Sequence, residues 1–341
     1  MSDPIFEVRN LDVSFAGSRG TSRVVRDVDL DVYREETLGI VGESGSGKSM
    51  LASALLNAVV EPGTTTGSVT YRPPDGPAVS VLELSEQELR RFRWEEIAMV
   101  FQGAMSSFNP VMRIRRHFRE TLQDHNRNIE AGLERAESLL ESVYLDPDRV
   151  LDAYPHELSG GMKQRALIAL SLLLEPQVIV MDEPTAALDL LMQRSIVSLL
   201  EELQATHDLT IVFITHDLPL LTKLADRLTV MYAFQLIETA TVDTILYDAA
   251  HPYTRALLSA TPDLDVAVDE MHAIDGTKPD PVEAIAGCSY HPRCPLADEQ
   301  CVRTEPPSTN HSEHHTASCF HHERAPAAVP IRGDDLEEAD R

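Results

Sequence analysis

The fold is decided by residues 42–49, which read Gly42-Glu43-Ser44-Gly45-Ser46-Gly47-Lys48-Ser49. This stretch fits the phosphate-binding loop pattern G-x-x-x-x-G-K-[ST] at every fixed position. The glycines let successive backbone N–H groups turn toward a β-phosphate, Lys48 adds a mobile cation for the β and γ oxygens, and the Ser49 hydroxyl is a ligand for Mg²⁺. The stretch therefore predicts a nucleotide site with a magnesium ion.

The flanking residues have the order that such a loop needs. Residues 37–41 read as a short buried strand, and residues 50–59 as the helix whose N-terminus faces the phosphates. A dinucleotide-binding fingerprint is the nearest rival pattern, but its third glycine position holds Met50 here. A glycine-rich turn without a ligand is the other alternative, and the strand and helix on either side argue against it.

Length and hydropathy limit the class of protein. The 341 residues allow a core domain plus an appendage. The longest apolar run, Ala166–Leu174, contains Ser171 and is far shorter than the roughly 18 residues of a membrane span. The N-terminus, Met1–Pro4, lacks the basic and apolar segments of a signal peptide, so we expect the protein to be made and kept in the cytoplasm.

The charge is strongly acidic, with 55 Asp and Glu residues against 29 Lys and Arg. Such a surface repels nucleic-acid phosphates and anionic lipid, so we expect no nucleic-acid partner. Dense carboxylates also suit a protein that works at high salt, and this predicts a halophilic source. An ordinary acidic cytosolic protein is the alternative, but lysine is nearly absent. The four lysines are Lys48, Lys163, Lys223 and Lys278.

The pattern of residues predicts a mixed α/β chain. Apolar alternation at 6–15 and 24–32 predicts antiparallel strands, and the Gly, Pro and Thr residues of 62–77 predict turns. Helical periodicity over 113–144 indicates an inserted helical subdomain. Short apolar runs at 178–181 and 210–214 are typical of buried parallel strands, so the core is predicted to be α/β.

Two further motifs bear on the same chemistry. Asp182 and Glu183 end a buried strand, where the first carboxylate suits Mg²⁺ and the second can polarise the water that attacks a γ-phosphate. Ser159, Gly160 and Gly161 open a helix whose N-terminus is a second candidate anion site, although a plain N-cap would also explain them. Two phosphate sites in one chain predict a composite pocket.

Together these residues resemble the ATP-binding subunits of ABC transporters. The motifs of that family occur here in the family's order. They are the phosphate loop, Gln102, the signature Leu158–Arg165, Asp182-Glu183, Ala187-Leu188-Asp189 and His216. The resemblance implies ATP and Mg²⁺ as ligands, with Ser49, Gln102 and Asp182 at the metal. It further implies Glu183, His216 and Gln102 as the catalytic set, with Asp189 in the D-loop. Phe15 matches the aromatic residue that stacks on adenine, but a place in the core is an equal alternative.

The resemblance narrows to the oligopeptide, dipeptide and nickel importer branch. The stretches that carry it are Phe101–Pro110, Tyr154–Glu157, His251–Thr254 and Gly287–Pro295. Two positions depart from the branch. Gly103 stands where an acidic residue is usual, and Phe234 stands where glycine is usual, which predicts a distorted hairpin because a positive φ is costly for phenylalanine.

The resemblance also implies the domain bounds. We expect an ABC ATPase domain at 1–246, a P-loop core with an N-terminal antiparallel β subdomain and a helical subdomain at about 105–165. After it we expect a C-terminal module of the oligopeptide/dipeptide-transporter type at 247–323. A disordered acidic tail is predicted at 324–341.

The four cysteines, Cys288, Cys294, Cys301 and Cys319, all lie in that module. Their spacing, C-x5-C-x6-C-x17-C, lacks paired CxxC knuckles and does not indicate a zinc ribbon. Four thiolates suit a [4Fe-4S] cluster, and some members of the resembled branch carry one. Zinc, with His291 or His311 as further ligands, and cysteines without any metal are the alternatives.

The resemblance implies an ATP-hydrolysing subunit that energises peptide import from the cytoplasmic face of the membrane. Its implied partners are a second ATPase subunit, identical or not, two transmembrane permease subunits and an extracytoplasmic solute-binding protein. A soluble ABC ATPase that acts on nucleic acid or ribosomes is the main alternative, and the acidic charge argues against it. A metal-sensing protein that keeps a P-loop fold is a third class, and the intact Glu183 argues against it.

Overall fold

The computed structural model describes residues 3–103, 107–186, 188–260, 274–277, 279–280, 282 and 285–331. The chain forms two compact units. Unit 1 comprises residues 1–6, 31–37 and 70–215, and unit 2 comprises residues 7–30, 38–69 and 216–341. In the part of the chain that the structure describes, none of the helices is long and apolar enough to cross a membrane.

Unit 1 contains a parallel sheet whose strands β6, β7 and β8 lie in that order. Their bounds are Ile97–Val100, Val178–Asp182 and Thr210–Ile214. All residues of β7 and β8 are buried, as expected for strands that are covered on both faces. The prediction of parallel strands at 178–181 and 210–214 is therefore confirmed. Strand β7 ends at Asp182 and is followed by Glu183, so both residues lie at the carboxyl end of this sheet.

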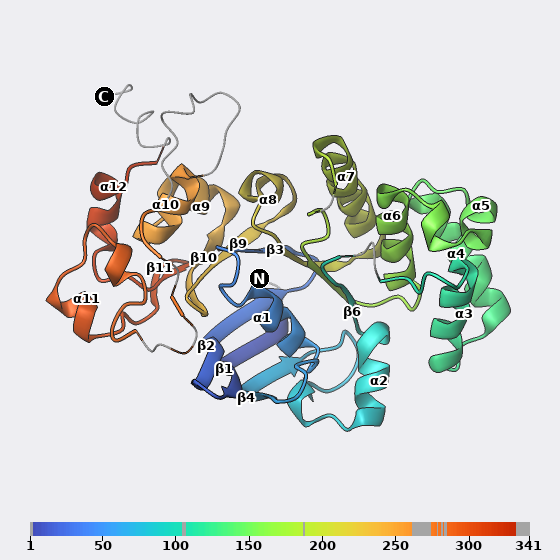
Figure 1. Ribbon diagram of the computed structural model, residues 1–341, viewed down its shortest axis with the longest axis horizontal. Helices are drawn as coiled ribbons and strands as arrows, with labels where there is room; N and C mark the ends of the chain where they lie inside the picture. The colour runs from blue at the N-terminus through green and yellow to red at the C-terminus, as the bar shows by residue number, and fades with distance from the viewer. Residues whose placement is uncertain are drawn as a thin grey trace. The chain divides into compact units, whose positions relative to one another are not determined.

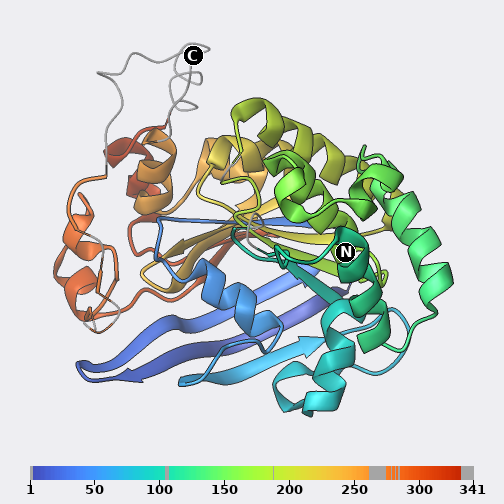
Figure 2. The same cartoon turned by 45° about the vertical axis from the view of Figure 1, so that its right-hand side comes forward.

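Helices make up much of the rest of unit 1. Helices α3, α4 and α5 contact one another, and α4 also contacts α6 (Figures 1 and 2, green). The amphipathic pattern predicted for 113–144 is confirmed, because Ala136, Leu140 and Val143 are buried. The helices of unit 1 are α2 (Glu86–Glu95), α3 (Ile114–Asp124), α4 (Ile129–Ser142), α5 (Pro147–Asp152), α6 (Gly160–Ser171) and α7 (Leu190–His207). Strand β5 (Val79–Ser80) and a 3₁₀ turn at Val81–Glu83 precede them.

Unit 2 contains the phosphate loop between β3 (Thr37–Val41) and α1 (Lys48–Leu55). Strand β3 is buried throughout and pairs in parallel with β9 (Arg227–Tyr232), which forms an antiparallel hairpin with β10 (Gln235–Thr241). The helix after the loop ends at Leu55, four residues before the predicted end at 59. Helix α8 (Leu218–Leu224) and helices α9 (Val242–Asp248) and α10 (Pro252–Ser259) flank this hairpin in the sequence.

The N-terminal sheet has the strand order β2-β1-β4-β5. Strands β1 (Pro4–Gly17) and β2 (Gly20–Tyr33) agree with the predicted pair. The prediction of turns over 62–77 was wrong for most of its length, because β4 spans Gly63–Tyr71, whereas residues 72–77 form neither helix nor strand. Three threonines followed by Val69 and Tyr71 favour a strand. Gly67 has φ 98° where a Cβ would lie 2.3 Å from the carbonyl oxygen of Asn10, so this glycine permits strand contact and does not mark a turn.

The C-terminal residues extend the sheet of unit 2. Strand β12 (His315–Ala317) pairs antiparallel with β10, and β11 (Thr309–Ser312) pairs with β12. Around them lie a 3₁₀ turn at His291–Arg293, helix α11 (Glu299–Arg303) and a 3₁₀ turn at His322–Arg324. The predicted domain bounds stay a prediction, but the module at 247–323 shares a sheet with the preceding residues.

The expected disordered tail at 324–341 differs from the structure at its beginning. Helix α12 spans Ala325–Ala328, Ala325 is fully buried, and Ile331 is nearly so. The backbone carbonyl of Val329 accepts a hydrogen bond from Nε of Arg255 at 2.6 Å, and Arg255 is itself fully buried. Apolar residues and a buried arginine therefore hold the first part of the tail, and 332–341 lie outside the described residues.

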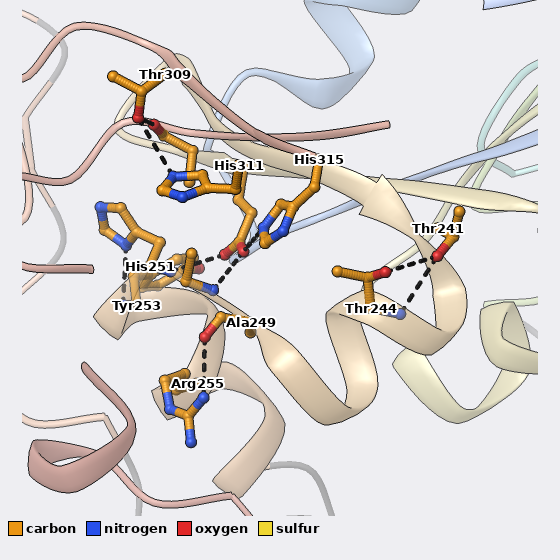
Figure 3. Close-up of polar contacts among 12 residues, drawn as sticks. Thr241, Thr244, Ala249, His251, Tyr253, Arg255, Thr309, His311 and His315 are labelled. Atoms are coloured by element: carbon orange, nitrogen blue, oxygen red, sulfur yellow. Dashed lines mark hydrogen bonds and ion pairs between the residues drawn. The ribbon is translucent and has the colours of Figure 1, made fainter. Parts of the chain in front are cut away.

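A buried carboxylate joins β10 to the C-terminal strands. The Glu238 side chain accepts hydrogen bonds from the backbone N–H groups of Ala250 at 2.6 Å and His251 at 3.0 Å, and its Oε1 lies 2.8 Å from Nε2 of His315. Burial raises the pKa of Glu238, but these hydrogen bonds outweigh it and lower the pKa below its usual value. Figure 3 shows the polar contacts of this region, with His315 and His251 labelled.

The stability of unit 2 should fall in acid because His251 is buried in its neutral form. Burial lowers the pKa of His251 to about 4, partly offset by Glu238, while the unfolded chain titrates near about 6.5. Between these values the unfolded state binds more protons, so acidification across this window should reduce the free energy of unfolding by about 3 kcal/mol. The variant His251→Asn keeps an acceptor for the N–H of Tyr253, which lies 3.0 Å from Nδ1. Urea unfolding at several pH values should show a flatter profile for the variant, and identical profiles would contradict this assignment.

Candidate functional site

The phosphate loop of unit 2 has the backbone that its glycines predict. Gly47 has φ 107°, and a Cβ there would lie 2.3 Å from the carbonyl oxygen of Val24. At Gly42 a Cβ would lie 2.1 Å from the carbonyl oxygen of Met231. Larger residues at either position would displace the backbone, so both glycines are required for the loop to pass this close to β9 and β2.

The polar side chains of the loop fit a phosphate ligand. Lys48 is buried, and its Nζ donates to the carbonyl oxygens of Gly42 at 2.8 Å and Glu43 at 3.0 Å. The Ser46 hydroxyl is buried and has no hydrogen-bond partner among the described residues. A buried hydroxyl without a partner is costly, and a phosphate oxygen would satisfy it. Ser44 and Gly45 are exposed, and Ser49 is half-buried at the start of α1.

The β9–β10 hairpin supports the loop through the unusual Phe234. Its N–H donates to the Ser46 carbonyl at 3.0 Å, and its own carbonyl accepts from the N–H of Arg26 at 2.8 Å. Ala233 and Phe234 have φ 47° and 73°, which is the two-residue turn that suits a twisted hairpin. The predicted distortion is absent at the turn itself, where Gln235 pairs with Tyr232, but the pairing register shifts farther along, between Leu236 and Glu238. Burial and hydrogen bonds hold Phe234 in its left-handed conformation.

Two more predicted residues lie in unit 2. Phe15 is half-buried in β1 on the same face as Leu11 and Val13, and a Cβ on Gly63 would contact its ring. His216 is exposed and directly precedes Asp217, whose side chain caps α8 by accepting from the N–H of Leu220 at 3.2 Å. The adenine role of Phe15 and the γ-phosphate role of His216 stay predictions.

Unit 1 brings Gln102 and Glu183 together. Nε2 of Gln102 donates to Oε2 of Glu183 at 2.8 Å. Glu183 has φ 47°, a costly conformation for glutamate, and its N–H donates to the carbonyl of Ile214 on β8 at 2.9 Å. Asp182 is nearly inaccessible at the end of β7. A partly exposed carboxylate beside a buried one suits the predicted roles in water activation and metal binding, which stay predictions.

The signature residues and the D-loop aspartate also lie in unit 1. Ser159 is exposed and caps α6, with Oγ accepting from the N–H of Met162 at 3.3 Å, and Gly160 and Gly161 form the first turn. A Cβ on Gly161 would lie 2.1 Å from Cε of Met192, so α7 passes close to this turn. Asp189 caps α7, and Ala187 lies outside the described residues. Gly103 has φ 84°, which explains a glycine at that departure from the branch.

All four cysteines line one cavity in unit 2, together with His251, Tyr290, His291 and His321 among others. Burial raises the pKa of the thiols, to about 11 for Cys288 and about 12 for Cys319, and the nearby Cys294 and Cys301 raise both values further. Among the described residues, one group of ligand atoms lies within 4.8 Å of one another, and it consists of Asp298, Cys301 and His321. The sequence pattern did not indicate Asp298 or His321.

Comparison with known proteins identifies the family. A family model described as "ABC transporter" matches residues 25–186, and one described as "Oligopeptide/dipeptide transporter, C-terminal region" matches residues 237–301. The "Dipeptide transport ATP-binding protein DppD" of Bacillus subtilis is 37% identical over 336 residues, covering 97% of this chain and 99% of the relative. The chain belongs to the ABC transporter ATP-binding proteins.

Other ABC transporter ATP-binding proteins agree with this placement. The "Oligopeptide transport ATP-binding protein OppD" of Bacillus subtilis is 39% identical and covers 96% of this chain and 91% of its own length. A "Putative peptide import ATP-binding protein" of Brucella abortus is 41% identical over 89% of this chain and 91% of its own length. A solved dimeric bacterial ABC transporter cassette is 26% identical with a TM-score of 0.60, covering 70% of this chain and 98% of that chain. The fold is the α/β P-loop ABC ATPase that the sequence predicted.

Proposed function

We propose that this ABC ATPase energises the import of peptides through a membrane permease. The chain is an ATP hydrolase of the ABC type. The observation that carries the peptide assignment is the match of residues 237–301 to the C-terminal region of oligopeptide/dipeptide transporters, since the ATPase domain alone does not specify a solute. The predicted alternative, a soluble ABC ATPase acting on nucleic acid or ribosomes, does not account for this match.

The same proposal assigns a role to each site residue. Residues 42–49 hold the β- and γ-phosphates, and the ligands of Mg²⁺ are Ser49, Gln102 and Asp182. Glu183 orients and polarises the attacking water, Gln102 positions Glu183 through the 2.8 Å hydrogen bond, and His216 contacts the γ-phosphate. Phe15 stacks on adenine. The nucleotide of a second ATPase subunit is contacted by Ser159, Gly160, Gly161 and Asp189.

The proposed assembly lies at the cytoplasmic face of the cell membrane. It contains a second ABC ATPase subunit, two permease subunits and an extracytoplasmic solute-binding protein. Purification of the complex from native membrane should recover a permease and a solute-binding protein, and peptides should stimulate its ATPase activity after reconstitution in vesicles. Recovery with ribosomes or nucleic acid in place of a permease would favour the alternative class.

We propose a [4Fe-4S] cluster on Cys288, Cys294, Cys301 and Cys319. The four sulfurs line one cavity but do not form a group within 4.8 Å of one another. Sulfurs on a single zinc ion would lie about 3.8 Å apart, given Zn–S distances of about 2.3 Å, whereas a cluster holds them more widely. A cluster would tie down a proline-rich segment that lacks a large apolar core of its own. Zinc is the alternative, and the close group of Asp298, Cys301 and His321 favours it.

Metal analysis of anaerobically purified protein separates the two ligands. We expect a brown protein with iron and acid-labile sulfide in equal amounts, and Cys294→Ser should lose the colour while nucleotide binding at residues 42–49 persists. The matched variant Asp298→Asn should leave the iron content unchanged, because Asp298 is a ligand only of the alternative zinc site. Stoichiometric zinc without iron, lost in Asp298→Asn, would decide for zinc, and protein without any metal would contradict both.

We also propose that the protein works at high salt. Its net charge of −26 makes carboxylate repulsion a general destabilising term in the folded state, and salt screens that repulsion. The thermal unfolding midpoint should therefore rise steadily as KCl increases from about 0.1 M to about 2 M. A midpoint that stays constant or falls over this range would indicate an ordinary acidic cytosolic protein.

A further inference from the structure

Residues outside the phosphate loop hold its Glu43 in place. The backbone N–H of Glu43 donates to the phenol oxygen of Tyr253 on α10 at 3.1 Å. Its carboxylate receives two hydrogen bonds from Arg293, from Nη1 at 2.9 Å and from Nη2 at 3.2 Å. All three residues belong to unit 2. Both the main chain and the side chain of this loop residue are therefore fixed by residues that follow position 250.

Arg293 is rigidly placed for this contact. Its side chain is 4% exposed, and that of Glu43 is 20% exposed. The guanidinium also donates to the carbonyls of Ile274 at 3.0 Å and Asp275 at 2.6 Å, and it lies against the ring of Tyr232. A bidentate guanidinium–carboxylate pair with little solvent access is strong and directional, and loss of either partner leaves a buried charge.

The turn that carries Arg293 is also the turn that carries two cysteines. His291–Arg293 form a 3₁₀ turn, closed by a hydrogen bond from the N–H of His291 to the carbonyl of Cys288 at 3.0 Å and from the N–H of Cys294 to the carbonyl of His291 at 3.3 Å. Cys288 and Cys294 both line the cysteine cavity. Arg293 therefore lies in a turn that is bounded on both sides by residues of the cysteine cavity.

We propose that Arg293 is a positioning residue that couples the cysteine turn, residues 288–294, to nucleotide binding at the phosphate loop. When the turn is ordered, Arg293 fixes Glu43 and holds the phosphate loop in the conformation that binds phosphates. With the turn disturbed, the loop loses this support and its affinity for nucleotide falls. The coupling rests on the proposed function of residues 42–49 as the ATP site. Because linkage is reciprocal, bound nucleotide must also order the cysteine turn.

The first test measures nucleotide affinity of the full chain with a fluorescent ADP analogue. Arg293→Gln and Glu43→Gln should each weaken binding about tenfold, and the double variant should be no weaker than either, because both remove one interaction. Arg293→Lys should recover part of the affinity, since lysine keeps the charge but not the bidentate geometry.

The matched control is Arg303→Gln, which changes an exposed arginine of the same module whose ion pair with Glu299 lies on the surface. For Arg293→Gln, which lies outside the phosphate loop, the steady-state KM for ATP should rise while kcat at saturation stays within about twofold.

The second test reads the coupling in the opposite direction. Maleimide labelling of Cys288 and Cys294 reports opening of the turn, because a thiol that is buried or bound to a metal does not react. Labelling is followed by mass spectrometry on the protein as purified, with and without saturating Mg-ADP. Nucleotide should slow the labelling of the wild-type chain severalfold, and Arg293→Gln should abolish this protection even when its site is saturated. Equal labelling rates with and without nucleotide in the wild type, or protection that persists in Arg293→Gln, would overturn the coupling alone. A wild-type chain that binds no nucleotide would overturn the proposed function and the coupling with it.

Discussion

Glu183→Gln should retain ATP binding and reduce steady-state turnover by at least about a hundredfold. The amide keeps the size of the side chain and can still accept the hydrogen bond that Gln102 donates at 2.8 Å. It lacks the negative charge that orients and polarises the attacking water, so the loss should fall on kcat and not on nucleotide affinity. ATPase rates of the assembled complex and equilibrium nucleotide binding, measured on the same preparation, check both parts.

Lys48→Ala is the matched contrast to Glu183→Gln. Lys48 belongs to the loop that holds the phosphates, so its removal should weaken nucleotide binding itself. Gln102→Ala gives an intermediate case, because it removes the partner of Glu183 without removing the carboxylate. Wild-type turnover in Glu183→Gln would show that Glu183 is not the catalytic carboxylate, and full nucleotide affinity in Lys48→Ala would remove the phosphate role of the loop.

The features that the sequence predicted correctly depend on local rules. The phosphate loop follows from the need for glycine at close backbone approaches, and the structure places carbonyl oxygens 2.1 Å and 2.3 Å from the Cβ positions of Gly42 and Gly47. The capping box at Ser85 and Glu88 also follows a local rule, because its bonds join residues three apart. Patterns of this kind need no knowledge of distant parts of the chain.

The features that the sequence did not predict depend on contacts between distant residues. Arg293 and Glu43 are separated by 250 positions, and nothing local to either residue indicates the pair. The strand at 63–71 was missed because its two glycines and its threonines resemble a loop until β1 is placed beside it. Phe234 was expected to disturb its turn, but hydrogen bonds to Ser46 and Arg26 outweigh the cost of its positive φ.

Ser159→Arg should abolish ATP hydrolysis although it leaves the phosphate loop of its own chain intact. Ser159 is exposed at the N-terminus of α6, where the proposed site of a partner subunit requires a small residue next to the γ-phosphate. Arginine would fill that space. The substitution also removes the hydrogen bond from the N–H of Met162, which costs about 1 kcal/mol of stability. Ser159→Ala is therefore the control, since it loses the cap without adding bulk, and it should keep most of the activity.

Mixing two inactive variants then tests whether two chains share each nucleotide. In a dimer with composite sites, a Lys48→Ala chain and a Ser159→Arg chain place both defects in one site and leave the other site intact. For a chain that pairs with itself, half of the dimers in an equal mixture are mixed, so about a quarter of the wild-type activity should return if the two sites work independently. A chain that hydrolyses ATP within its own boundaries would give no rescue on mixing, and a monomeric preparation would show the full rate. If ATPase activity returns only when both variants are present in one complex, each nucleotide site must be shared between two chains.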